Sequence, residues 1–263
     1  MTLSQKIGAM TLGAILVLVS LGPFVWPASP TDQNLAEIIQ RPSATHLLGT
    51  DQYGRDVLAR LMHGGRASLQ ASVVIVILSL AIGAAGGLLA SGHGWTARLL
   101  TRIIDILLAL PSLVIALVIV GALGIGMTNL AIAFIAVGWP YYARLVRGFS
   151  RERLKALDIA AARVMGVPHH RVILTHVLPH AARRLAVAGG LDLGYTLGAL
   201  AGFSYLGLGA QAPAAEWGLM LRDAQLFFTA APWLLLAPSC LIALTVLSAL
   251  FLVEDSLNSG VTR

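Results

Sequence analysis

Long apolar stretches alternate with shorter polar segments along the 263 residues of this chain. Six apolar stretches of roughly 20 residues each match, at 1.5 Å per residue, a hydrocarbon layer about 30 Å thick. Lipid offers no hydrogen bonds to the backbone, so stretches of this length must be helices and not barrel strands. The pattern predicts an all-α polytopic membrane protein with six transmembrane helices in a single domain, residues 1–263. The expected crossings are residues 7–26, 67–91, 103–124, 129–146, 185–208 and 233–253.

The basic residues predict how these helices are oriented. With six crossings both termini lie on one side, and most of the 18 Lys and Arg residues are cytoplasmic if the termini are. Cytoplasmic loops of membrane proteins carry such an excess, so we expect both termini in the cytoplasm. The segments outside the membrane are then a periplasmic segment at 27–66, a cytoplasmic loop at 147–184 and a periplasmic loop at 210–232.

Composition supports the membrane interpretation. Hydrophobic residues make up 57% of the chain and charged residues 11%, whereas soluble domains carry about 25% charged residues. The net charge of +6 could indicate nucleic acid, but membrane orientation already explains it, so the expected partner is the lipid bilayer and not nucleic acid. The first apolar stretch exceeds the roughly 7 to 15 residues of a secretory signal core, so we expect a retained helix. A lone cysteine, Cys240, excludes an intrachain disulfide.

The cytoplasmic loop carries a second, shorter helical pattern. Apolar residues recur there at three- and four-residue spacing, which predicts an amphipathic helix that Gly166 and Pro168 stop. Three consecutive alanines would let another surface approach this helix closely. Two interpretations remain open: the helix fits a groove of a partner protein, or it lies on the membrane surface. The recurring residues are Leu154, Leu157, Ala161 and Met165.

This loop resembles the pattern E-A-A-x-x-x-G-x(9)-L-P of bacterial binding-protein-dependent ABC importer permeases. The residues on that pattern are Ala160, Ala161, Ala162, Gly166 and Pro179, with Ala160 at the usual place of Glu. The resemblance implies that 154–167 is the coupling helix, which docks on an ATPase subunit. The implied coupling residues are Leu154, Leu157, Asp158, Ala160, Ala161, Ala162, Arg163, Met165 and Gly166.

Two further segments resemble the dipeptide, oligopeptide and nickel branch of the same family, in its C-type subunit. Residues 46–61 are similar to the motif that precedes the second helix, and residues 203–218 are similar to the F-L-G-L-G and W-G pair. Arg102, Asp105 and Pro111 match the entry of the third helix. The tail at 254–258 departs from the G-D-G-L-R of the branch.

The resemblance also implies a machine made of several subunits in the bacterial inner membrane. This chain would pair with a second permease subunit and with two cytoplasmic ATPase subunits, which bind ATP and Mg. A periplasmic or lipid-anchored solute-binding protein would deliver substrate near residues 45–60 and 216–228. The chain carries no G-x-x-x-x-G-K-[ST], H-E-x-x-H or G-x-S-x-G motif, so we expect neither enzyme activity nor a bound cofactor or metal of its own.

Residues within the membrane supply further candidates. A four-residue glycine repeat predicts close helix packing and an interface with the second permease, at Gly190, Gly194, Gly198 and Gly202. Asp192 either lines the substrate path or makes a structural hydrogen bond, and the second role is favoured. We expect Asp105 to pair with Arg102, three residues earlier. The loop histidines lack Cys or carboxylate ligands nearby, so no zinc site is expected at His169, His170, His176 and His180.

The sequence leaves open the substrate and the class of membrane protein. Peptide-type members usually carry a Glu where this chain has residues 200–202, so nickel or another chelated metal is preferred over di- and oligopeptides. A self-sufficient secondary transporter or channel is the alternative. It would need paired acids near the midplane, where only Asp192 is expected. A membrane enzyme ranks third, because no nucleophile or metal set is recognisable.

Overall fold

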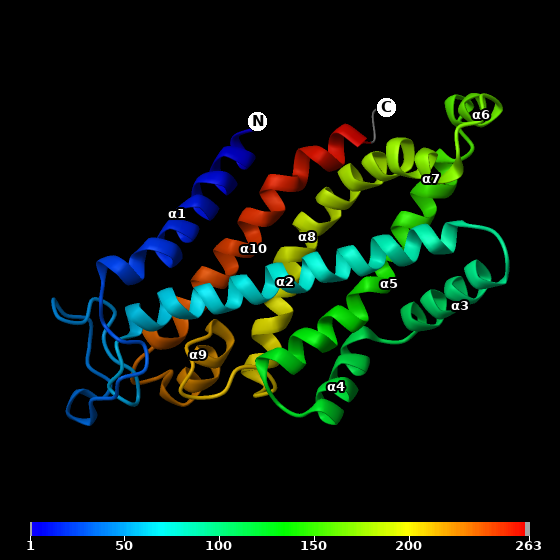
Figure 1. The fold of residues 1–263 in the computed structure, drawn as a ribbon. Coiled ribbons are helices and arrows are strands. Elements are labelled where there is room, and N and C mark those ends of the chain that lie inside the picture. The colour runs from blue at the N-terminus through cyan, green and yellow to red at the C-terminus, as the bar shows by residue number, and fades with distance from the viewer. Residues whose placement is uncertain (1, 261–263) are drawn as a thin grey trace. The chain divides into compact units, whose positions relative to one another are not determined.

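The computed structural model describes residues 2–260, apart from the side chains of Arg163, His169, His170, Arg183 and residues 254–260. Within that part of the chain the regular elements are helices (Figure 1). A single turn of π-helix, Ile173–Val177, connects α7 to α8. The α-helices are α1 (Leu3–Val25), α2 (Val57–Ser91), α3 (Trp95–Ala109), α4 (Ser112–Leu123), α5 (Met127–Arg153), α6 (Leu157–Val164), α7 (His169–Val172), α8 (Leu178–Tyr205), α9 (Trp217–Ala224) and α10 (Trp233–Gly260).

Several of these helices are long and apolar enough to cross a bilayer. Four stretches meet this condition among the described residues, and a fifth is added if α3 and α4 count as one bent span. The all-α, multi-pass prediction is therefore confirmed, whereas the count of six crossings is not. The four stretches are Leu3–Val25, Val57–Ser91, Ile173–Tyr205 and Trp233–Val253.

The predicted crossing at 103–124 is not one helix. It is divided between α3 and α4, whose axes are bent by 95°. Pro111 explains the break, because proline lacks an N–H and forces the preceding residue out of the helical region. Leu110 accordingly adopts an extended backbone, with φ −91° and ψ 144°. Helix α4 has 12 residues, so it is about 18 Å long and shorter than the hydrocarbon layer.

The predicted crossing at 129–146 is helical, but it forms only part of α5. Helix α5 runs for 27 residues, from Met127 to Arg153. It is not among the four apolar stretches, since Asn129 and Arg144 lower its mean hydropathy.

Helix α2 begins well before the predicted start at residue 67, so the polar segment ends at Asp56 and not at residue 66. The basic residues of the first turns are compatible with a helix because they find acceptors inside the fold. Arg66, for example, donates from Nε to the carbonyl oxygen of Val19 over 2.8 Å and also binds that of Ser20. These carbonyls lie near the end of α1, so the polar positions of α2 hold α1 in place.

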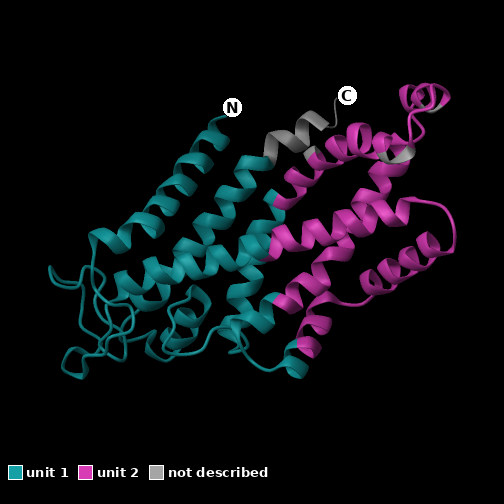
Figure 2. Cartoon of the chain, viewed as in Figure 1, with its two compact units in different colours: residues 1–74, 120–131, 190–263 teal, residues 75–119, 132–189 magenta. Residues whose placement is uncertain are grey.

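The chain forms two compact units (Figure 2). Unit 1 contains residues 1–74, 120–131 and 190–263. Its core surrounds Trp217 and includes Val19 of α1, Leu61 of α2 and Leu234 of α10. Helices α1 and α10 run side by side in this unit (Figure 1).

Unit 2 contains residues 75–119 and 132–189. In this unit the second half of α2 lies close against α5. A Cβ atom added at Gly83 would lie 2.4 Å from Cβ of Tyr142, and one added at Gly87 would lie 2.5 Å from the carbonyl oxygen of Ala143. Only glycine allows these backbones to approach so closely, as is common between membrane helices.

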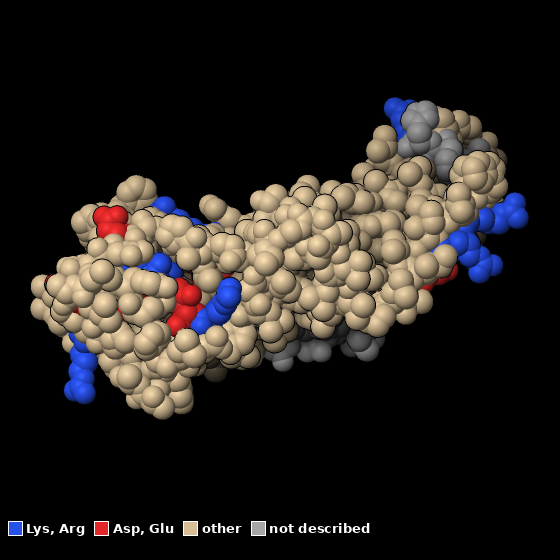
Figure 3. Space-filling view, turned by 90° about the horizontal axis from the view of Figure 1, so that it is seen from below, with Lys and Arg blue, Asp and Glu red and all other residues tan. Residues whose placement is uncertain are grey.

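Large apolar side chains lie on the outside of both units. Met10 and Phe24 of α1 and Val118 of α4 are among the exposed ones. The face seen in Figure 3 accordingly carries few charged side chains. Such a surface would favour aggregation in water, but it is the expected surface of helices in contact with lipid.

We predict that Gly83→Ala destabilises the protein by about 1–3 kcal/mol, because the new methyl group would meet Tyr142 and the backbone at Trp139. The measurement is thermal unfolding of the detergent-solubilised chain. Gly121→Ala is the matched control, since an added Cβ on α4 would have nothing within 4 Å. Equal shifts for the two variants would contradict the close contact between α2 and α5.

Candidate functional site

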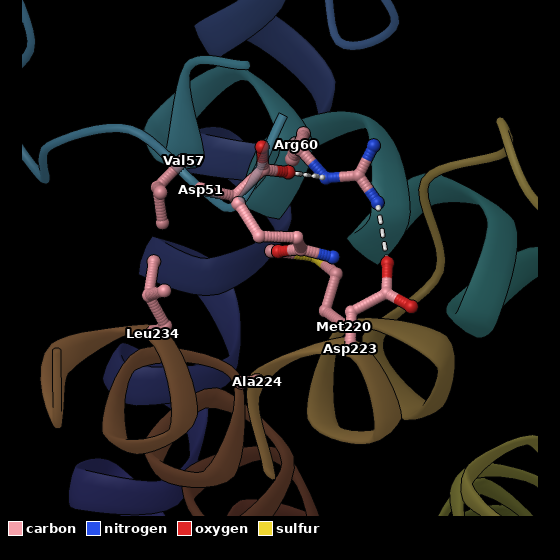
Figure 4. Close-up of a pocket in the computed structure, with 8 residues that line it drawn as sticks. Asp51, Val57, Arg60, Met220, Asp223, Ala224 and Leu234 are labelled. Carbon is pink, nitrogen blue, oxygen red and sulfur yellow. Dashed lines mark ion pairs between the residues drawn. The ribbon is translucent and has the colours of Figure 1, made fainter. Parts of the chain in front are cut away.

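Unit 1 contains a cluster of four charged side chains, three of them buried and one, Asp223, partly exposed. Figure 4 labels Asp51, Arg60 and Asp223 of this cluster. Asp51 accepts from Nε of Arg55 over 2.7 Å and lies 3.3 Å from Nε of Arg60. Asp223 of α9 lies 3.4 Å from Arg55 and 3.7 Å from Arg60. Both arginine side chains are almost fully buried, so their charge must be matched inside the protein. Two carboxylates face two guanidiniums, and the cluster is therefore neutral.

A small cavity beside this cluster has a volume of about 10 Å³. That volume holds at most one water molecule. It is lined by Asp51, Arg60, Met220 and Asp223, among others (Figure 4). The cluster is therefore a structural element and not a pocket for a solute.

The loop before α2 is shaped by the same residues. The Asp51 carboxylate accepts the backbone N–H groups of Tyr53 and Arg55, at 2.9 and 3.0 Å. Gly54 has φ +69°, and an added Cβ would lie 1.8 Å from the carbonyl oxygen of Asn34, so only glycine fits. Gly49 also has positive φ, at +73°. The glycines and the aspartate of this sequence motif thus build one folded loop.

Asp56 caps α2 and ties it to the end of α1. Its carboxylate accepts the backbone N–H of Ala59 over 2.8 Å, which satisfies one free donor of the first helical turn. It also accepts the indole N–H of Trp26 over 3.2 Å and lies 2.8 Å from Nδ1 of His46.

Glu216 performs the corresponding role for α9. Its carboxylate accepts the N–H groups of Gly218 and Leu219, at 2.9 and 2.8 Å, and the hydroxyl of Ser68 on α2, at 2.8 Å. The next residue, Trp217, is fully buried and donates its indole N–H to the carbonyl oxygen of Leu61 over 2.9 Å. Helix α9 is therefore locked onto α2 by a capping residue and its neighbour.

Gly218 brings α9 against α8 as well. An added Cβ there would lie 2.4 Å from the carbonyl oxygen of Ala201. The W-G pair of the second motif therefore contributes to packing. Trp217 fills the core, and Gly218 leaves room for the backbone at Ala201. The residues at 46–61 and 203–218, far apart in the sequence, contribute to one connected structure.

The segments expected to contact a solute-binding protein divide into buried and exposed residues. Arg55, Arg60 and Glu216 are each only 1% exposed, so their side chains are not available to a partner. Large apolar side chains in the same segments are exposed instead, at Leu47, Leu226 and Phe228.

A helix forms in the segment expected to be the coupling helix, but it is shorter than predicted. Helix α6 covers Leu157–Val164 and not the whole of 154–167. Leu154 lies in the turn between α5 and α6 and packs on a small core of Ile159, Val172 and Val177. Gly166 has φ +81°, which fits its predicted role as a stop.

The two sides of α6 differ in burial. Ile159 and Ala162 are buried against the rest of unit 2, whereas Leu157 is 88% exposed and Met165, directly after the helix, is 77% exposed. Val164, Ala160 and Ala161 are exposed as well. In the predicted apolar stripe, Leu154 therefore points to the core of unit 2, while the other members lie on the open side.

One ion pair fixes the start of α6. Arg153, the last residue of α5, donates to both carboxylate oxygens of Asp158, at 2.8 and 2.5 Å. These hydrogen bonds lower the pKa of Asp158. The carboxylate therefore stays charged, and the ion pair intact, at pH values below the usual pKa of an aspartate. Asp158 also lies in the first turn of α6, where a negative charge is favourable. The side chain of Arg163, also among the expected coupling residues, lies outside the described ones.

The glycine face of α8 is half occupied within the chain. A Cβ at Gly190 would lie 3.1 Å from Cγ2 of Val253, and one at Gly194 would contact α10 at 3.5 Å. An added Cβ at Gly198 or Gly202 would have nothing within 4 Å, and both residues are exposed. The first half of the repeat packs on α10 and the second half is open.

Of the acidic residues expected in or near the membrane, one has a different partner from that predicted. Asp105 accepts from Arg144 of α5 over 2.8 Å, so the expected pair with Arg102 is wrong. Asp192 is partly buried on α8 and engages in an interaction with its surroundings.

Two of the four loop histidines, His176 and His180, have described side chains. His176 accompanies His180 and Glu152 in a groove of about 460 Å³. No group of three or more His, Cys, Asp or Glu suited to a metal occurs among the described residues.

Sequence reasoning missed Asp223 and Ser68, which complete the two buried arrangements of unit 1. Their partners Arg55 and Glu216 are 168 and 148 residues away in the chain. No local spacing relates residues at such a distance, so only the fold brings them together.

Comparisons with known proteins agree with the resemblance of the sequence motifs. Residues 75–254 match the family described as Binding-protein-dependent transport system inner membrane component. The dipeptide transport system permease protein DppC of Alkalihalophilus pseudofirmus is 37% identical over 92% of this chain and 80% of its own length. The glutathione transport system permease protein GsiD of Pectobacterium atrosepticum is 38% identical over 83% of this chain and 73% of its own. The nickel transport system permease protein NikC of Escherichia coli is 35% identical over 95% and 91%.

Solved structures support the fold. A chain of the inward-facing MetNI methionine ABC transporter matches with a TM-score of 0.60 and 20% identity, over 77% of this chain and 96% of that chain. A second crystal form matches with a TM-score of 0.55 and 21% identity, over 78% and 97%. At this level of identity the likeness concerns the fold.

We predict that Glu216→Ala destabilises the protein by about 2–4 kcal/mol, because two N–H groups and a hydroxyl lose a charged acceptor in a buried place. Thermal unfolding in detergent measures the effect. Glu152→Ala serves as control, because this exposed carboxylate is 3.4 Å from Arg184 and its loss should cost less than about 1 kcal/mol. Similar losses for both variants would show that the cap does not hold α9.

Proposed function

The chain belongs to the binding-protein-dependent transport system inner membrane component family, and we propose that it is a permease subunit of an ATP-driven solute importer. In this proposal the chain forms part of the translocation path, while ATP is hydrolysed on separate subunits. The observation that carries the proposal is the open apolar side of α6, where Leu157 and Met165 lie exposed.

The side chains on the open side of α6 suit contact with a partner protein. Large apolar side chains outside the membrane favour a covering surface, and Ala160 and Ala161 leave room for it to approach the helix backbone. We assign this side to the cytoplasmic ATPase, present in two copies, which binds ATP and Mg. A helix lying on the membrane surface is the competing arrangement, and the experiment below separates the two.

The buried side of α6 provides a way to transmit movement. Ile159 packs against Val172 of α7 and Val177 of the π-helical turn, and that turn leads into α8. A push on α6 is therefore passed to the start of α8 through close-packed side chains. Closure of the ATPases would in this way shift the population between outward and inward access.

The open part of the glycine face suits a second permease subunit. Gly198 and Gly202 lie exposed on α8, next to the exposed ring of Tyr195 on the same helix. Small residues permit close and smooth contact between two helices, which an interface that moves during transport requires. Asp192, on the same helix, is the candidate for a polar group near the path.

The solute-binding protein, periplasmic or lipid-anchored, is assigned to the exposed residues of unit 1. Leu47, Leu226 and Phe228 offer apolar contacts, and the buried ion cluster holds their segments in a fixed conformation. We place both chain termini in the cytoplasm, which puts these residues on the opposite side of the membrane from α6.

For the substrate we propose nickel or another chelated metal, or a di- or oligopeptide. The relatives named for dipeptide, glutathione and nickel transport match with identities of 37%, 38% and 35%, so identity does not separate them. The absence of a Glu at residues 200–202 favours the metal chelate.

We expect Ala161→Arg to lower the amount of ATPase that co-purifies with the chain by about tenfold or more, because an unpaired charge buried at an interface costs about 2–5 kcal/mol. ATP-dependent uptake into proteoliposomes should fall with it. Ala214→Arg is the control, since it adds the same side chain at an exposed alanine outside α6.

Two results would contradict the assignment. Undiminished recovery of the ATPase with Ala161→Arg would leave α6 to the membrane surface. Uptake by the unaltered chain without ATPase and ATP, driven by an ion gradient, would make it a secondary transporter. Uptake assays with radioactive nickel and with a labelled dipeptide, each with the cognate binding protein, decide the substrate.

A further inference from the structure

A basic pocket lies in unit 2, between the turn that follows α2, the polar side of α3 and the end of α5. Its volume is about 490 Å³. Four guanidinium groups dominate its lining, together with one carboxylate and the turn at 92–94. The charged lining residues are Arg98, Arg102, Asp105, Arg147 and Arg151.

The positive charge of this pocket is not balanced from within. Asp105 supplies its only lining carboxylate, and Arg144, which does not line the pocket, already pairs with that carboxylate at 2.8 Å. Across the described part of the chain no ion pair involves any of the four lining arginines. The Nε groups of Arg98 and Arg147 donate to the carbonyl oxygens of Gly94 and Ala90, both at 3.3 Å. A carbonyl oxygen carries no formal charge, so these hydrogen bonds do not balance the positive charge of the arginines. The four like charges line one pocket and repel one another, so a bound anion would stabilise it.

The donors present suit a phosphate group. Guanidinium groups bind phosphate oxygens through two parallel hydrogen bonds, more specifically than ammonium groups do. Helix α3 also begins at this pocket, and its N-cap Gly94 has no side chain to accept the N–H groups of the first turn. Those N–H groups add donors beside the arginines.

A second property of α3 points to the rest of the ligand. Exposed apolar side chains lie along the helix at spacings of three and four residues, and so on one face, at Trp95, Leu99, Ile103 and Ile106. Arg98 and Arg102 lie on the same helix beside this face. Interfacial helices combine basic and apolar faces in this way, and Trp prefers the headgroup level.

A molecule with a phosphate head and apolar tails satisfies both faces of α3 at once. We propose that the pocket binds the phosphate of an anionic phospholipid, whose acyl chains lie along Trp95, Leu99, Ile103 and Ile106. Basic pockets between membrane helices are suited to such headgroups. The phosphate, with one negative charge, would offset part of the positive charge of the four arginines where α3 approaches the end of α5.

Binding to the unaltered chain in detergent, followed by native mass spectrometry, tests the lipid class. Phosphatidylglycerol should be retained more strongly than phosphatidylcholine, which has a phosphate but no net charge. The double variant Arg102→Gln/Arg151→Gln should lose about 30-fold in phosphatidylglycerol affinity, since each arginine contributes about 1 kcal/mol. The control Lys6→Gln/Arg41→Gln removes the same charge from exposed positions elsewhere and should lose much less.

The other outcomes either overturn the proposal or identify the source of the phosphate. Equal retention of the two lipids by the unaltered chain, or equal losses for the two double variants, would overturn the proposal. Competition arms identify the source of the phosphate: displacement of phosphatidylglycerol by millimolar inorganic phosphate would assign the pocket to a free anion. Resistance to inorganic phosphate, with displacement by a second anionic phospholipid, would support the lipid site.

Discussion

The structure of unit 1 depends on pairing its buried charges with oppositely charged groups or with hydrogen-bond donors. Asp51 and Asp223 face Arg55 and Arg60, and their mutual attraction offsets the cost of burying Asp51 and the two arginines. Glu216 is matched differently, by the N–H groups at the start of α9 and by a hydroxyl of α2. These two arrangements fix the loop before α2, the first turns of α2 and the whole of α9. The apolar side chains exposed on the same segments are therefore presented from a rigid base.

Close backbone contact is the second constraint, and glycine makes it possible. In unit 2 the glycines of α2 bring it against α5, and in unit 1 Gly190 and Gly194 bring α8 against α10. The repeat on α8 continues beyond this contact to Gly198 and Gly202, whose sides are open. A single sequence pattern thus brings two helices of the chain together with its first half and leaves its second half open.

Exposure separates the residues that build the fold from those that remain available to partners. Helix α6 is anchored by Ile159 and leaves Leu157 and Met165 open. Helix α3 buries Ala97 and Ile104, while its basic and apolar faces remain accessible. In each case one side of the helix is packed against its own unit, and the other side is accessible. The family relationship and the open sides of these helices together lead to the transport machine that we propose.

Composition and residues close together in the chain are sufficient to predict the helical class, most of the membrane stretches, the family and the stop at Gly166. The sequence points to Pro111 only as a family position, and it predicts six continuous crossings, whereas α3 and α4 are bent by 95°. Only the folded chain shows that Asp105 pairs with Arg144, that Asp223 completes the ion cluster and that the motif charges are inaccessible. These features join residues from distant parts of the chain, and hydrophobic periodicity carries no information about which of them meet.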